Sequence, residues 1–120
     1  MNDPLKNLYI CRETLLKEIG SFISNLYLDT SLYQLKVILK TGSILYIRYN
    51  EFGEYGYQYM FSRKKNDFVR WDNFDDRWLV NSRPHHFHER NNSRVKDSLM
   101  VGEPLNDMQV LINYIKRQFK

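Results

Sequence analysis

The chain has 120 residues, of which 42% are hydrophobic, enough for one hydrophobic core and therefore one domain over residues 1–120. One cysteine excludes a disulfide framework within the chain, and a formal net charge of +4 favours an anionic partner, either nucleic acid or an acidic protein. No apolar run approaches the roughly 20 residues of a membrane span, and the first residues do not resemble a signal peptide. We therefore expect a cytoplasmic protein with no membrane partner.

The first segment carries the signals of a helix. Asp3 can accept hydrogen bonds from the first free amides, Pro4 suits the first helical turn, and Gly20 is a natural end. The apolar residues near one face at helical spacing are Leu5, Leu8, Leu15, Leu16 and Ile19. These features predict a helix over residues 4–19. Residues 22–28 alternate as a strand would, with a continued helix as the alternative.

The middle of the chain alternates between apolar and polar residues, which is typical of strands. The strands that this alternation predicts cover residues 33–39, 44–49, 55–61 and 68–73. The short connections between them imply an antiparallel meander. In the last of these strands we expect Trp71 in the core, while Arg70 and Asp72 project together from the opposite face.

The segment after residue 73 is irregular at first, and we expect Trp78, Leu79 and Val80 to anchor it by apolar contacts. If the chain is extended after Pro84, His86 and His88 point to one side and His85 to the other. Residues 89–103 are predicted to form a loop.

A C-terminal amphipathic helix is predicted from an apolar stripe of helical spacing. The stripe consists of Leu105, Met108, Leu111, Ile112, Ile115 and Phe119. Asn106 and Gln109 resemble a capping box at its start. The predicted fold is therefore α+β: an antiparallel sheet of about five strands, flanked by a helix at each end of the chain.

The chemistry of the chain is concentrated between residues 70 and 88, where all three histidines fall within four positions. Cleavage of RNA through the 2′-hydroxyl requires a base, an acid and a cation that stabilises the phosphate. Imidazoles could serve as base and acid, Arg70 could bind the phosphate, and Asp72 or Asn73 could orient an imidazole or the ribose. The residues therefore suit a metal-independent ribonuclease, whose candidate catalytic residues would be Arg70, Asp72, Asn73, His85, His86 and His88.

Three alternatives use the same residues. His86 and His88 could bind a metal ion with Asp72 as a third ligand, but the pattern matches no standard ligand spacing, and we expect neither a metal nor another cofactor. The histidines could instead be structural residues that hold the loop. Finally, the histidine-rich segment could belong to a non-catalytic module that docks a partner protein or RNA.

Two motifs together resemble a known family. Arg70-Trp71-Asp72-Asn73 and Pro84-His85-His86-x-His88, after a tyrosine-rich strand and before a C-terminal helix, resemble the TumE-like toxins of type II toxin–antitoxin systems over roughly residues 32–119. The resemblance implies a cytosolic prokaryotic protein that is paired with a helix-turn-helix antitoxin and is toxic through nucleic acid, plausibly RNA cleavage. The sequence also permits a homodimer.

One departure from the family pattern bears on the site. A further histidine often follows the Arg-Trp-Asp-Asn run, whereas this chain has Phe74-Asp75-Asp76-Arg77. If that histidine is catalytic in the family, this chain is impaired or uses Asp75 or Asp76 in its place.

Overall fold

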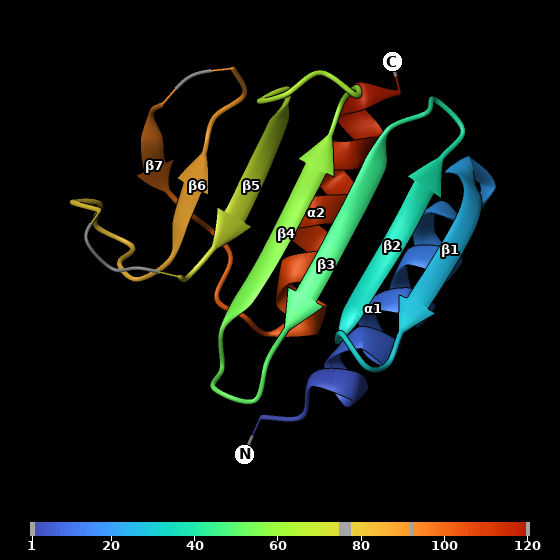
Figure 1. Ribbon diagram of the computed structural model, residues 1–120, viewed down its shortest axis with the longest axis horizontal. Coiled ribbons are helices and arrows are strands. Elements are labelled where there is room, and N and C mark those ends of the chain that lie inside the picture. The colour runs from blue at the N-terminus through green and yellow to red at the C-terminus, as the bar shows by residue number, and fades with distance from the viewer. Residues whose placement is uncertain (1, 75–77, 92, 120) are drawn as a thin grey trace.

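Two helices and a seven-stranded sheet make up the computed structural model, which describes residues 2–74, 78–91 and 93–119 (Figure 1). Helix α1 (Pro4–Ile19) and a short 3-10 turn (Gly20–Phe22) precede the sheet, and helix α2 (Pro104–Gln118) follows it. The strands are β1 (Ile23–Asp29), β2 (Gln34–Leu39), β3 (Ile44–Tyr49), β4 (Tyr55–Met60), β5 (Phe68–Asp72), β6 (His86–His88) and β7 (Val95–Asp97). The predicted α+β class is confirmed.

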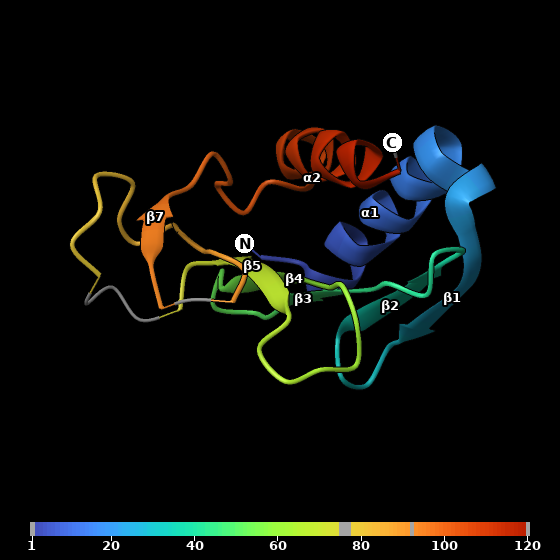
Figure 2. The ribbon, with the colours of Figure 1, turned by 90° about the horizontal axis from the view of Figure 1, so that it is seen from above.

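The sheet is a pure antiparallel meander, because the strands neighbour one another in chain order from β1 to β7. Both helices lie on one face of this sheet, as Figure 2 shows. Among the described residues no helix lies on the other face, and we call it the open face. A side chain on any strand therefore points either into the core under the helices or onto the open face.

Helix α1 begins as its sequence predicts. Asp3 Oδ1 accepts a hydrogen bond from Lys6 N at 3.1 Å, and Pro4 occupies the first turn. The buried stripe differs from the predicted one: Cys11 is fully buried, Leu5 is only partly buried, and Leu16 is 45% exposed. Leu16 points outward because the buried side of α1 covers a smaller part of the helix circumference than the apolar pattern predicted. The ambiguous segment after Gly20 is resolved as strand β1.

The core lies between the helices and the inward residues of the strands. The tyrosines of β4 at positions 55, 57 and 59 are each no more than 1% exposed. Tyr57 donates a hydrogen bond to Asp107 Oδ2 of α2 at 2.7 Å, which satisfies the buried hydroxyl. Trp71 is 5% exposed and packs edge-on against Tyr114 of α2, so its predicted place in the core is confirmed.

The segment around the last two strands departs from prediction in three places. Residues 89–103 are not a continuous loop, because Val95–Asp97 pairs with β6 as strand β7. Leu79 is 90% exposed and cannot anchor its segment. Helix α2 begins at Pro104, where Glu103 Oε2 accepts from Asn106 N at 2.7 Å, so Asn106 is not the cap. A two-stranded pairing of three residues each is too short to leave a periodic pattern in the sequence.

The predicted stripe of α2 is buried at its four central residues, while its last residue, Phe119, follows the end of the helix and is partly buried. Met108, Leu111, Ile112 and Ile115 are at most 2% exposed, whereas Leu105 is 58% exposed. We expect Ile112→Ala to lower the free energy of unfolding by about 2–5 kcal/mol, because the truncation leaves a cavity under the sheet. Urea denaturation measures this, with Leu105→Ala as the exposed control. A loss as small as that of the control would show that α2 does not seal the core.

Candidate active site

Strands β5 and β6 bring the two sequence motifs side by side. In their antiparallel register Arg70 pairs with His88, Trp71 with Phe87, and Asp72 with His86. Trp71 and Phe87 contact each other on the helix side, with ring centroids 5.0 Å apart. The other four side chains therefore share the open face, as the alternation along the two segments predicted.

Asp72 is the centre of this cluster. Its Oδ2 lies 2.5 Å from Arg70 Nε and 3.8 Å from His88 Nε2, and its Oδ1 lies 2.6 Å from His86 Nε2. The carboxylate side chain is only 5% exposed. Burial of an unpaired charge costs free energy of folding. The guanidinium and the imidazole beside Asp72 offset this cost.

The hydrogen bonds of His86 determine its tautomer. Its Nδ1 lies 2.9 Å from the carbonyl oxygen of Pro84, which can only accept, so Nδ1 carries a proton. A bare Nε2 lone pair would repel Asp72 Oδ1 at 2.6 Å, so a proton or a cation has to lie between these two atoms. Among the described residues, no well-aligned hydrogen bond reaches the buried Oδ1 atom. At 2% exposure, the imidazole of His86 is out of reach of a substrate and acts on Asp72 instead.

His88 is the imidazole that a substrate can reach. Its side chain is 28% exposed, and the ring of Trp78 packs edge-on against it with centroids 5.7 Å apart. Burial lowers the pKa of His88 below its ordinary value of 6.5; the carboxylate of Asp72 opposes this shift, and electrostatic contributions from the neighbouring His86 and Arg70 reinforce it. His88 is therefore neutral at pH 7 and can accept a proton.

Two predicted site residues lie elsewhere. His85 points to the helix side, where its Nδ1 is 2.9 Å from the hydroxyl of Tyr55 and its ring stacks on the same tyrosine. Asn73 accepts from Tyr55 N at 2.9 Å and donates to Gly53 O at 3.0 Å, which ties together the ends of two strands. Neither side chain joins the cluster around Asp72. Asp75 and Asp76, the suggested substitutes for a missing histidine, lie outside the described residues.

The cluster also has the donor set of a metal site. One ligand atom each from Asp72, His86 and His88 lies within 4.8 Å of the others, and two imidazoles with a carboxylate suit Zn²⁺ and related ions. The guanidinium of Arg70 already places a positive charge 2.5 Å from the same carboxylate, which weakens its attraction for a further cation. The donor atoms are thus of the type that binds a metal ion, while Arg70 competes with such an ion for the carboxylate of Asp72.

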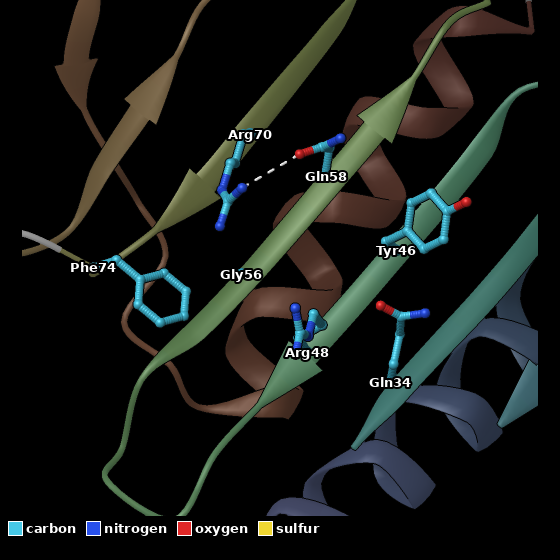
Figure 3. Close-up of a pocket in the computed structure, with 7 residues that line it drawn as sticks. All are labelled: Gln34, Tyr46, Arg48, Gly56, Gln58, Arg70 and Phe74. Carbon is cyan, nitrogen blue, oxygen red and sulfur yellow. Dashed lines mark hydrogen bonds between the residues drawn. The ribbon is translucent and has the colours of Figure 1, made fainter. Parts of the chain in front are cut away.

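A hollow of about 260 Å³ opens on the open face beside the cluster (Figure 3). Gly56 forms its floor, and Arg48, Arg70 and Phe74 contribute to its walls. Neither Arg48 nor Gly56 was among the predicted site residues. A glycine inside a tyrosine-rich strand was the available signal, because such a glycine commonly marks a place where a ligand approaches the backbone.

A family model described as Toxin TumE matches residues 10–119. The chain belongs to the TumE toxin family. Membership of this toxin family implies an antitoxin partner. The match includes both motifs of the cluster, so the TumE resemblance predicted from residues 70–73 and 84–88 is confirmed. We found no match among curated proteins or among solved structures. Within the described part of this TumE chain, neither helix has the length and apolar character that crossing a membrane requires.

Proposed function

We propose that this TumE chain cleaves RNA in the cytoplasm without a metal ion, and that a helix-turn-helix antitoxin restrains it. The observation that supports cleavage is a reachable, neutral imidazole, His88, next to a guanidinium, Arg70, over a buried carboxylate. That combination supplies a proton acceptor and a phosphate ligand on one exposed surface.

In the proposed reaction, the 2′-hydroxyl attacks the phosphate and the residues of the cluster have the following roles. His88 accepts the proton of the 2′-hydroxyl, whose oxygen attacks the neighbouring phosphorus. The bond to the 5′-oxygen breaks, and that oxygen takes a proton from solvent. The products are a 2′,3′-cyclic phosphate and a 5′-hydroxyl end. Arg70 stabilises the charge that accumulates on the phosphate oxygens during this step.

The orientation of Arg70 is held from two sides. Its Nε is 2.5 Å from Asp72 Oδ2, and its Nη1 donates to Gln58 Oε1 at 3.4 Å. The remaining N–H groups are directed toward the hollow above Gly56, where Arg70 Nη2 would lie only 3.3 Å from a Cβ atom at that glycine. A guanidinium fixed in this way loses little side-chain entropy when it binds phosphate. His86 and Asp72 are positioning residues in this scheme, because they act through Arg70 and His88.

The test is incubation of the purified protein with total RNA, with and without EDTA, followed by analysis of the new RNA ends. We expect fragments with cyclic phosphate and 5′-hydroxyl ends in both samples. Cleavage that EDTA abolishes and Zn²⁺ restores would replace the metal-independent mechanism with one at the Asp72, His86 and His88 ligand set. Intact RNA in both samples would contradict the nuclease.

The pH dependence of cleavage follows from the environment of His88. Because its pKa lies below 6.5 in the folded protein, the base stays neutral at a pH where an ordinary histidine is half protonated. We expect the acid limb of the kcat/KM profile to have its midpoint below pH 6.5. A midpoint above pH 6.5 would exclude His88 as the base. The unfolded chain binds the proton more readily, so His88 also contributes stability that is lost as the pH falls below 6.5.

The burial of His86 favours a second candidate, a non-catalytic module that docks RNA or a partner protein through this surface. Only one imidazole of the cluster is reachable, whereas removal of a proton from the 2′-oxygen and delivery of a proton to the 5′-oxygen would be served better by two. His88→Ala separates the candidates: a docking module loses affinity in a graded way, while a nuclease loses its cleavage.

A further inference from the structure

The hollow in Figure 3 is built across four strands of the open face, from β2 to β5. One row of paired residues runs through Tyr46, Gln58 and Arg70, and the adjacent row contains Arg48 and Gly56. Because Gly56 has no side chain, the second row is interrupted and the surface is hollowed at that point. An added Cβ atom there would lie 3.3 Å from Arg70 Nη2 and 3.5 Å from Phe74 Cε2, so even alanine would narrow the space.

The side chains around the hollow combine positive charge with aromatic surface. Arg48 and Arg70 bring two guanidinium groups, and the described lining residues include no carboxylate. Phe74 lies on one side of Gly56 and Tyr46 on the other (Figure 3). The side-chain amide of Gln58 adds hydrogen-bonding capacity. Phosphate pairs with guanidinium groups, and a nucleobase stacks on an aromatic ring, so the lining matches both parts of a nucleotide.

Arg70 connects this hollow with the cluster around Asp72. It lines the hollow above Gly56, and it also lines a second one of about 300 Å³ that contains Asp72 and His88. A phosphate bound to Arg70 would therefore have one neighbouring nucleotide on each side. The side toward His88 is where the reacting 2′-hydroxyl belongs.

We propose that the hollow above Gly56 binds a nucleotide of a single-stranded RNA. This nucleotide lies on the opposite side of the scissile phosphate from the one that carries the reacting 2′-hydroxyl. Phe74 stacks on its base, and Arg48 binds its next phosphate. This proposal rests on the RNA cleavage proposed above. It adds that the substrate is unpaired RNA. A base within a duplex is already stacked and paired, and only an unpaired base is free to stack on a side chain.

Binding is measured by fluorescence anisotropy with a short labelled oligoribonucleotide, in the His88→Ala background so that the RNA is not consumed. Arg48→Gln removes the phosphate ligand, and Arg117→Gln removes the same charge from the exposed side of α2 as its control. Phe74→Leu removes the stacking ring, and Phe52→Leu, at a site 86% exposed, is its control. Gly56→Ala, at a position without a positive φ, fills the floor by a single methyl group.

We expect Arg48→Gln to weaken binding and to lower the slope of log K against log salt by about 0.7, the value for one phosphate contact on a single strand. Phe74→Leu should weaken binding about 5- to 150-fold without changing that slope, as loss of one base stack does. Gly56→Ala should also weaken binding, while both controls bind like the background protein. A duplex of the same sequence should compete poorly.

The site is wrong if Arg48→Gln and Phe74→Leu bind the oligonucleotide as tightly as their controls. Competition by the duplex equal to that of the single strand would overturn the choice of unpaired RNA. These outcomes are separable from the nuclease itself, which is read from wild-type protein and total RNA. If the wild-type protein cleaves RNA and the variants bind with unaltered affinity, the nuclease is supported and this subsite is wrong. If the hollow binds RNA specifically and the wild-type protein does not cleave it, the subsite is supported and the nuclease is wrong.

Discussion

Cleavage of RNA by His88→Ala is expected to be about 10²- to 10⁴-fold slower than by the wild-type protein, the contribution of one well-placed proton acceptor. The reason is geometric: His88 is the imidazole of the cluster that is both exposed to a substrate and next to the guanidinium of Arg70. The measurement is the single-turnover rate on a defined oligoribonucleotide, together with the relief of growth arrest in expressing cells.

The control is another histidine three residues away. His85→Ala removes an imidazole that faces Tyr55 on the helix side, and we expect it to cleave RNA at nearly the wild-type rate. His86→Ala is expected to impair both folding and cleavage, because the buried ring supports Asp72. Equal loss of activity in His85→Ala and His88→Ala, with both proteins folded, would contradict the assignment of the base.

Replacement of the central carboxylate is expected to have the largest effect on stability. Asp72→Ala should lower the free energy of unfolding by about 3–5 kcal/mol, because it leaves the buried imidazole of His86 and the Nε of Arg70 without their common partner. The same change should abolish cleavage, since Arg70 is then free to rotate away from the phosphate. Urea denaturation and the cleavage assay measure the two losses on one preparation.

An exposed ion pair provides the comparison for Asp72. Glu13 lies 3.5 Å from Arg12 on α1 with its side chain 71% exposed, so Glu13→Ala should cost no more than about 1 kcal/mol. Asp72→Asn keeps the shape of the side chain and removes its charge, which separates the electrostatic contribution from the packing. If Asp72→Ala unfolds at the same urea concentration as Glu13→Ala, the carboxylate does not hold the cluster together.

Local periodicity was sufficient to predict which face each strand residue occupies. Side chains alternate along any extended segment, so Trp71 could be assigned to the core and Arg70 and Asp72 to the other side before the position of any neighbour was known. The same rule placed His86 and His88 together and His85 apart from them. Both helices were predictable for a similar reason, since caps and apolar stripes depend on residues within a few turns. The cap predicted the start of the first helix, and the apolar stripe predicted the second, whose cap is Glu103 and not Asn106.

The tertiary structure alone decided what those residues meet. Alternation does not determine register, and it is the pairing of β5 with β6 that sets Asp72 opposite His86 and Arg70 opposite His88. The burial of His86, which separates it in role from His88, depends on the packing around two strands and Trp78. The hollow above Gly56 requires Arg48, Arg70 and Phe74 from separate parts of the chain to converge. Contacts of this kind are not local in sequence, so no pattern within a single segment could have predicted them.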